Sequence, residues 1–305
     1  MSKITLTIDD QIVQVEAGAT VLEAARAVGI DIPTLCYHPE LSLFGSCRVC
    51  MVEDLKTKKL LAACVTPATE GMTISTRSAR VRAARKRNVE LLLANHPNDC
   101  LGCDRNGSCE LQCLTYALGI TKDDVQKYAG EIRKAQIIGE GSALKRDPNK
   151  CILCGRCVRV CAEVQGIDTL DFAGRGFDAM VTTAFDLPQS EMNCALCGQC
   201  AAVCPVGALT EISEADQVWE ALENPDKFVV VQVAPAVQVS LGEEFGLEPG
   251  TVVTGKMITA LRKLGFDRVF STEFTADLTI MEEGYEFIAK IKGGKKLPHI
   301  TSCCP

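Results

Sequence analysis

Eighteen cysteines in 305 residues constrain this chain more than any other feature, because they fall into tight groups. The groups occupy residues 36–64, 100–113, 151–161, 194–204 and 303–304. The N-terminal residues show neither the basic nor the apolar region of a secretory signal, so we expect a cytoplasmic, reducing location where disulfides are rare. Short, repeated cysteine spacings in such a location predict metal centres.

The rest of the composition excludes several other classes of protein. Hydrophobic residues make up 47% of the chain, which is typical of a soluble globular protein. The net charge of −7 argues against nucleic acid or an anionic membrane surface as a partner. No apolar run is long enough to span a membrane.

The strongest signal is an internal repeat of a ferredoxin type. Cysteines follow one another with spacings of two, two and three residues, first from Cys151 and again from Cys194. In two-cluster ferredoxins the fourth cysteine of each run binds the other cluster. The repeat therefore predicts one [4Fe–4S] site on Cys151, Cys154, Cys157 and Cys204, and a second on Cys194, Cys197, Cys200 and Cys161. Structural zinc, the alternative, is typically held by separated cysteine pairs.

Two further sets leave more than one interpretation open. Cys36, Cys47, Cys50 and Cys64 suit a [2Fe–2S] cluster wrapped by a loop, with a zinc ion as the alternative. His96, Cys100, Cys103 and Cys109 form a Cys3His set, which in isolation also fits structural zinc. Its position between two iron–sulfur modules favours a His-ligated [4Fe–4S] cluster.

The remaining cysteines and histidines carry weaker expectations. Cys113 follows a ligand set that is already full, so we expect a buried free thiol. His38 and His299 have no ligand spacing and are interpreted as ordinary residues.

The segments between the cysteine groups predict an α+β multidomain fold. Residues 4–15 predict a β-hairpin that turns at Asp9 and Asp10, followed by a helix over 21–28 capped by Thr20. Residues 1–79 are thus expected to form a β-grasp [2Fe–2S] ferredoxin domain. Residues 80–140 would form a small helical domain with the His/Cys cluster, and residues 141–212 the two-cluster bacterial ferredoxin domain. A basic helix over 78–95 fits either a docking surface for an acidic redox partner or a solvated helix face.

The last segment, residues 213–305, alternates helices and strands. Strands are expected over 228–233 and 268–271 and near 299–301, and helices over 214–224, 254–265 and 276–293. Such alternation predicts a parallel, buried α/β sheet with functional groups at the carboxyl ends of its strands. Ala234 and Pro235 follow one of these strands, and Cys303 and Cys304 follow another.

The order of these sites resembles a known electron-input module. CYHPELSLFGSCRVC, then NHPNDCLGCDRNGSCELQ, then the paired ferredoxin motif are similar to the module shared by [FeFe]-hydrogenases, the large iron–sulfur subunit of complex I and some formate dehydrogenases. VQVAPAVQVSLGEEFG, FTADLTIMEEGYEF and the terminal TSCCP resemble the opening of the parallel α/β catalytic domain of [FeFe]-hydrogenases.

The resemblance implies roles for residues of the last segment. Cys304 matches a ligand of the H-cluster cubane, and Cys303 matches the cysteine that passes protons to the active site. Glu283 and Glu286 match members of the proton path. Ala234, Pro235 and Ala236 match the loop that lines the di-iron pocket, although some relatives have serine in place of Ala236.

The resemblance also implies an activity and partners. The family interconverts H2 with protons and electrons, and multi-cluster members work with flavin- and NAD(P)-binding diaphorase-like subunits or with ferredoxin. No glycine-rich dinucleotide fingerprint occurs in this chain, since Gly174 and Gly176 lack the third glycine. The later cubane ligands do not occur among the 305 residues, so the H-cluster is incomplete here and we expect no H2 turnover by this chain alone. The competing hypothesis is a non-catalytic electron-transfer adaptor subunit.

Overall fold

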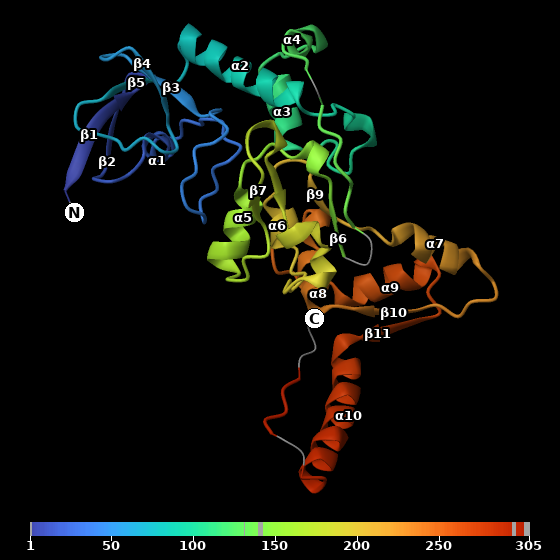
Figure 1. The fold of residues 1–305 in the computed structure, drawn as a ribbon. Coiled ribbons are helices and arrows are strands. Elements are labelled where there is room, and N and C mark those ends of the chain that lie inside the picture. The colour runs from blue at the N-terminus through green and yellow to red at the C-terminus, as the bar shows by residue number, and fades with distance from the viewer. Residues whose placement is uncertain (1, 131, 140–142, 295–296, 302–305) are drawn as a thin grey trace. The chain divides into compact units, whose positions relative to one another are not determined.

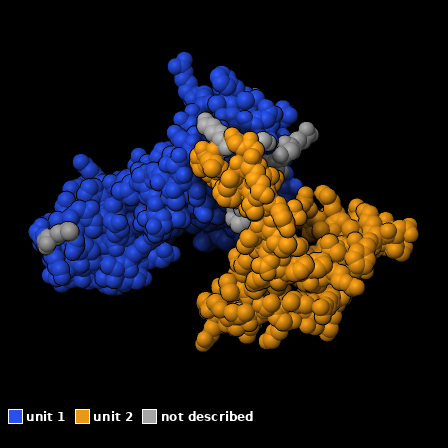
Figure 2. All heavy atoms as spheres, turned by 90° about the horizontal axis from the view of Figure 1, so that it is seen from below, with its two compact units in different colours: residues 1–212 blue, residues 213–305 orange. Residues whose placement is uncertain are grey.

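The chain consists of two compact units, residues 1–212 and residues 213–305, which Figure 2 shows in blue and orange. The computed structural model describes residues 2–130, 132–139, 143–294 and 297–301. Both units contain helices and strands, in keeping with the α+β class. None of the described helices has both the length and the apolar character that crossing a membrane requires.

The first part of unit 1 is a five-stranded sheet with one helix against it (Figure 1). β1 pairs antiparallel with β2 and parallel with β5, and β3 pairs antiparallel with β4 and β5. Asp9 and Asp10 have φ of 44° and 73°, the left-handed geometry of a tight hairpin turn, so the predicted hairpin is confirmed. The strands, in the order β2-β1-β5-β3-β4, are Gln11–Glu16, Lys3–Ile8, Thr73–Ser75, Met51–Asp54 and Lys59–Ala62.

Helix α1 (Val21–Ala27) begins with a reciprocal cap. The Thr20 hydroxyl accepts from the Glu23 backbone N–H at 3.2 Å, and the Glu23 carboxylate accepts from the Thr20 N–H at 2.7 Å. Val21, Leu22 and the alanines that follow are buried against the sheet. The helix predicted after Thr20 is therefore confirmed.

Helix α2 (Ala79–Ala94) carries the basic residues, most of which are bound within the protein. Arg80 Nη1 lies 2.6 Å from Glu53 on β3, and buried Arg85 donates to the Met51 carbonyl at 3.0 Å. Lys86 Nζ lies 3.0 Å from Asp124 on α4 (Lys122–Gln126). These side chains attach α2 to its neighbours, while Arg82 and Arg87 are exposed, so the solvated helix face is confirmed only in part. The docking surface stays a prediction.

The two-cluster segment is built from short elements. Strand β6 (Leu144–Arg146) pairs with β9 (Leu209–Glu211), and β7 (Asp171–Ala173) pairs with β8 (Met180–Thr182). Helices α5 (Arg156–Arg159) and α6 (Gln199–Ala202) start at equivalent positions of the cysteine repeat, and a π turn (Val160–Val164) follows α5. One hydrophobic core joins this segment to the Cys36–Cys47 loop, α2 and α3 (Glu110–Ala117).

Unit 2 is built around two parallel strands, β10 (Val230–Val233) and β11 (Arg268–Ser271). The predicted parallel pairing is confirmed. The predicted burial is wrong for β10, where only Val233 is buried and Val230 is 52% exposed, because no further described strand extends the sheet. The helices of unit 2 are α7 (Ala215–Glu223), α8 (Pro235–Ser240), α9 (Thr254–Leu264) and α10 (Thr272–Lys292).

Other differences from the sequence expectations are local. Helix α8 was not expected, and Pro235 at its first position pre-sets a helical φ. The predicted strand near residues 299–301 is wrong, since these residues pair with no described strand. Single 3-10 turns occupy Cys100–Gly102, Pro148–Lys150, Gly176–Asp178, Ala184–Asp186, Gln189–Glu191 and Glu243–Phe245.

Candidate metal centres

Four buried thiols lie beside the N-terminal sheet. Cys36, Cys47, Cys50 and Cys64 are all buried, and the sulfurs of Cys50 and Cys64 lie 3.3 Å apart. Hydrogen bonds from the thiols of Cys47 and Cys64 lower the pKa of Cys36, while the same bonds to Cys36, followed by burial, raise the pKa of Cys47 and Cys64. A thiolate shared among four buried sulfurs is a donor set suited to an iron centre.

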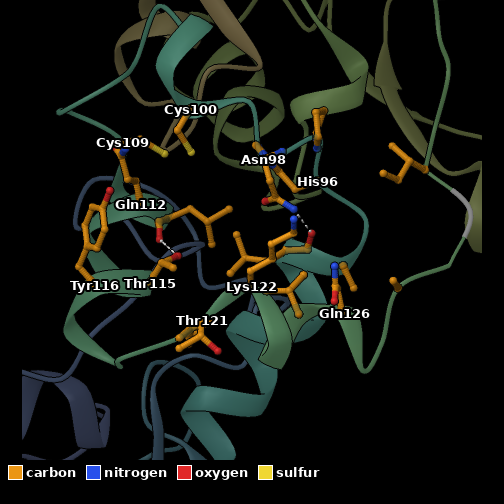
Figure 3. Close-up of a pocket in the computed structure, with 18 of the residues that line it drawn as sticks. His96, Asn98, Cys100, Cys109, Gln112, Thr115, Tyr116, Thr121, Lys122 and Gln126 are labelled. Carbon is orange, nitrogen blue, oxygen red and sulfur yellow. Dashed lines mark hydrogen bonds between the residues drawn. The ribbon is translucent and has the colours of Figure 1, made fainter.

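The Cys3His set borders a cavity of about 640 Å³. Figure 3 shows His96, Cys100 and Cys109 among the side chains that line it. Burial raises the pKa of Cys109, and the neighbouring thiols of Cys103 and Cys100 raise it further. Cys103 also packs against the ferredoxin segment, because a Cβ added to Gly207 would stand 2.6 Å from the Cys103 sulfur. Glycine at position 207 is thus required by this close approach.

His96 has the burial and the free ring nitrogen that a metal ligand needs. Its side chain is buried, and its Nε2 atom has no hydrogen-bond partner among the described residues. Burial lowers the pKa of His96, so the imidazole is neutral and can offer a lone pair. The Asn98 N–H lies 3.2 Å from Nδ1. Ligation through Nε2 puts the ring proton on Nδ1, so we expect this contact to lengthen when a metal centre binds.

The cysteine repeat is also a repeat of unusual backbone geometry. Leu153 and Leu196 occupy equivalent positions and have φ of 54° and 50°, in the left-handed region that non-glycine residues rarely adopt. In both places the leucine N–H points at the first cysteine of the run, Cys151 or Cys194, with an N to Sγ distance of 3.4 Å. Backbone strain repeated at the same motif position marks a site built to receive an anionic group.

Tertiary structure brings the fourth cysteine of each run toward the other run. A cavity is lined by Cys151, Cys154, Cys157 and Cys204 together. Cys161 accepts from the Thr169 N–H at 3.3 Å, and the Thr169 hydroxyl donates to the carbonyl of Asn193, next to Cys194. Thr169 thus ties Cys161 to the loop that carries Cys194, Cys197 and Cys200.

Burial makes these thiols poor acids in the absence of a cation. It raises the pKa of Cys154 to about 12 and that of Cys200 to about 11, and raises that of Cys157 well above its usual value. Metal binding offsets this cost because it replaces the thiol protons. Within the described ranges, no three His, Cys, Asp or Glu side chains converge as a single ion would require. An iron–sulfur core fits wider thiol spacing, because irons and sulfides separate the ligands.

Two features of this region were missed or wrong in the sequence analysis. Arg159, between Cys157 and Cys161, contacts both the Cys36 loop and the ferredoxin motif. A break in the repeat marks it, since Ala202 stands at the equivalent position. Cys113 is exposed rather than buried, because Leu111 supplies the buried face of α3 and Cys113 lies about 200° further around the helix.

The other two histidines make contacts outside the predicted ligand sets. His38 Nδ1 lies 3.3 Å from the Glu40 N–H. His299 stacks on Phe287, its Nδ1 lies 2.6 Å from Lys290 Nζ, and its Nε2, like that of His96, has no hydrogen-bond partner among the described residues.

Of the residues predicted for unit 2, only the loop after β10 lies at the end of a parallel strand. Ala234, Pro235 and Ala236 directly follow β10 and are exposed. Glu283 and Glu286 lie on α10, and the Thr301 hydroxyl donates to Glu283 at 2.9 Å. Cys303 and Cys304 lie outside the described residues.

Family models match four consecutive parts of the chain. Residues 1–79 match a 2Fe-2S iron-sulfur cluster binding domain, and residues 85–124 match the NADH-ubiquinone oxidoreductase-G iron-sulfur binding region. Residues 141–210 match the ferredoxin-like domain of NADH-quinone oxidoreductase subunit 3. Residues 227–305 match the C-terminal domain of the iron only hydrogenase large subunit.

Individual relatives agree with this order of domains. NADP-reducing hydrogenase subunit HndD of Solidesulfovibrio fructosivorans is 48% identical over 100% of this chain and 54% of its own length. Iron hydrogenase 1 of Clostridium pasteurianum is 39% identical over 94% of this chain and 50% of its own length. The chain thus spans about half the length of these curated relatives.

A solved structure shares the fold of a large part of the chain. It is a chain of an NAD+-reducing [NiFe]-hydrogenase in the H2-reduced state, 35% identical, with a TM-score of 0.64. The match covers 70% of this chain and 88% of that one. Together with the cysteine sets and the hydrogenase match in residues 227–305, these likenesses show a multi-cluster, [FeFe]-hydrogenase-like chain that carries an iron–sulfur electron-relay part.

Proposed function

We propose that residues 1–212 hold four iron–sulfur clusters that carry electrons to or from a hydrogenase catalytic domain beginning near residue 213. The observation that carries this proposal is the cavity lined by Cys151, Cys154, Cys157 and Cys204, which joins both cysteine runs around one space. When bound, iron–sulfur clusters accept and release single electrons at potentials set by ligation, burial and hydrogen bonds to sulfur.

Each cluster has its own ligand set and domain in this proposal. Residues 1–79 hold a [2Fe–2S] cluster, residues 80–140 a His-ligated [4Fe–4S] cluster, and residues 141–212 two further [4Fe–4S] clusters. The ligands in chain order are Cys36, Cys47, Cys50 and Cys64, then His96, Cys100, Cys103 and Cys109, then Cys151, Cys154, Cys157 and Cys204, then Cys161, Cys194, Cys197 and Cys200.

The set around Cys151 adjoins both outer sets, which supports a role as the junction of two electron inputs. His96 and Cys151 line one cavity of about 150 Å³. From the other side, the Ser46 hydroxyl donates to the Leu153 carbonyl at 3.4 Å. Neighbouring centres of this kind exchange electrons without large motions of the protein.

The whole protein is proposed to interconvert H2 with protons and electrons. Its electron partners would be flavin- and NAD(P)-binding subunits or ferredoxin, because HndD is named as a subunit of an NADP-reducing hydrogenase. Cys303, Glu283 and Glu286 would move protons, while Cys304 and the loop Ala234–Ala236 would hold the active-site cofactor. The Thr301–Glu283 hydrogen bond supports this path, because Thr301 precedes Cys303 by only two positions in the sequence.

The test is metal analysis of the 305-residue chain after anaerobic reconstitution. We expect about fourteen irons per chain with a matching amount of acid-labile sulfide, and both [2Fe–2S] and [4Fe–4S] signals by EPR. One zinc per chain with about four fewer irons, and no change in iron on His96→Ala, would mean that the Cys3His set is a structural zinc site and that one input is absent.

One observation favours the adaptor as a second candidate for unit 1. The match to the NAD+-reducing [NiFe]-hydrogenase chain covers 88% of that chain and 70% of this one. An adaptor would pass electrons between partners without H2 chemistry. Extension of the reading frame past residue 305 into further glycine-flanked cysteine motifs supports the hydrogenase, and a stop codon there supports the adaptor.

A further inference from the structure

A single buried arginine joins the two neighbouring ligand sets of unit 1. Arg159 Nη2 lies 2.6 Å from the carbonyl oxygen of Cys36 and 3.5 Å from that of Cys154. Cys36 belongs to the N-terminal set and Cys154 to the first ferredoxin run. One guanidinium nitrogen therefore touches the backbone of a ligand residue on each side.

The other atoms of Arg159 hold the same two segments. Nη1 donates to the carbonyl of Ser42, and Nε donates to that of Gly155 at 3.1 Å. In the described part of the chain these contacts are all to carbonyls, and no carboxylate forms an ion pair with Arg159. Glu163, which accepts from Ser42, interacts electrostatically with Arg159 without forming an ion pair. The guanidinium charge lies, largely shielded from water, between two sites that gain negative charge on reduction.

Further side chains around Arg159 connect the Cys36 loop with the ferredoxin motif. The Phe44 ring lies 5.2 Å from the guanidinium carbon and stacks on Phe172, with 5.8 Å between ring centres. Gly155 has φ of +69°, and a Cβ there would stand 3.0 Å from Phe44. Ser42 also donates its N–H to Glu163 at 2.8 Å. The loop is thus held on the ferredoxin motif at several points around Arg159.

We propose that Arg159 is a positioning residue for electron transfer between the N-terminal cluster and the Cys151 cluster. Its hydrogen bonds fix the separation of the two ligand sets, and its charge favours the reduced form of both clusters. This inference rests on the proposed function, because it takes both sets to hold iron–sulfur clusters. In the step concerned, the reduced [2Fe–2S] cluster loses one electron and the adjacent [4Fe–4S] cluster gains it. A one-electron donor such as reduced ferredoxin supplies that electron, and no proton is exchanged.

The test compares variants that separate the charge of Arg159 from its hydrogen bonds. In Arg159→Gln we expect the midpoint potentials of both clusters, measured by EPR-monitored titration, to become more negative. In Arg159→Lys the potentials stay close to those of the parent, because the charge remains. In both variants we expect electron transfer between the two clusters to slow severalfold, as measured by rapid-freeze EPR. The reason is that the planar guanidinium, whose N–H donors hold the Cys36 loop, is lost.

A matched control and a structural readout complete the design. Arg133 also donates to main-chain carbonyls, those of Pro148, Phe177 and Ala179. It lines a cavity with Cys151, and none of these carbonyls belongs to the Cys36 loop. Arg133→Gln should therefore shift the midpoint potential of the Cys151 [4Fe–4S] cluster and leave that of the [2Fe–2S] cluster unchanged. The loop offers trypsin an exposed Arg48, so we expect faster cleavage there in Arg159→Gln and unchanged cleavage in Arg133→Gln.

The outcomes separate this inference from the function on which it rests. A parent protein without a [2Fe–2S] signal would refute the proposed function itself. A parent with all its clusters, and an Arg159→Gln variant with unchanged potentials, transfer rate and cleavage at Arg48, would refute the role of Arg159 alone. If Arg159→Gln fails to assemble its clusters, Arg159→Lys decides, and a normal transfer rate in that variant contradicts the proposal.

Discussion

At the scale of single residues, His96 combines an unpaired buried atom with neighbouring thiols. A buried ring nitrogen without a partner costs free energy, and His96 differs from the equally unpaired His299 because Cys100 and Cys109 line the same cavity. The neighbouring Cys103 is packed so closely against Gly207 that even a methyl group there would displace its sulfur. Both observations concern the Cys3His set, and both fit an iron–sulfur cluster that packs against these side chains.

We therefore expect His96→Ala to lose about four irons per chain, because a [4Fe–4S] cluster with three thiolates lacks its fourth protein ligand. His96→Cys should restore most of that iron, since a thiolate can take the place of the imidazole. Iron and sulfide assays with EPR measure both. His38→Ala is the control, because His38 makes only a local contact to the Glu40 N–H, and its iron content should equal that of the parent. Equal iron in His96→Ala and the parent would exclude His96 as a ligand.

At the scale of elements, short helices carry the ligand loops and side-chain pairs hold these helices in place. Helices α5 and α6 have four residues each, too few to be stable by themselves, so their position depends on tertiary contacts. Arg156 on α5 binds Glu110 on α3 through two N–H donors at 2.6 and 3.0 Å. This pair joins the helix of the Cys3His domain to the first ferredoxin run.

Glu110→Ala should lower the free energy of unfolding by about 1–2 kcal/mol, because it leaves the buried Arg156 guanidinium without its anion. The figure is modest because the Glu110 side chain is 42% exposed and water screens the pair. We expect a fall of about 2–6 °C in the apparent Tm, measured by thermal unfolding of the cluster-loaded protein. Glu191→Ala, at an exposed glutamate, should leave the Tm unchanged. Equal Tm values for the two variants would show that the pair contributes nothing.

At the scale of the whole molecule, the two units differ in how much apolar surface they bury. Nearly all the buried apolar side chains of the described residues belong to unit 1, and unit 2 contributes Val233, Val253 and Met257. Helix α10 has no buried residue, although it carries several large apolar side chains. Burial of apolar area is the main source of stability, so unit 1 is expected to be the more stable of the two.

Limited proteolysis of the 305-residue chain with its clusters bound should therefore degrade unit 2 first. We expect a resistant fragment that ends near residue 212, identified by intact mass, and retention of the iron by that fragment. The reverse result, a resistant fragment of residues 213–305 with loss of unit 1, would show that buried apolar area does not decide the order of unfolding here.

The sequence by itself determined the residue types and spacings that define the sites. Cysteine runs, the single histidine before Cys100 and the turn residues Asp9 and Asp10 act through local chemistry, and local chemistry can be read along a chain. Helix and strand type followed in the same way, since the apolar periodicity of residues 4–15 and 21–28 matches the observed elements.

Only the tertiary structure decided which residues far apart in the chain meet. Arg159 reaches Cys36 across 123 positions, and Phe44 stacks on Phe172, although neither contact has a local signature beyond the break in the repeat at Ala202. The tertiary structure also decided which residues are buried, since Cys113 is exposed and only Val233 of strand β10 is buried. The physical reason is that burial and long-range contacts depend on which surfaces pack together, and spacing along the chain does not specify that packing.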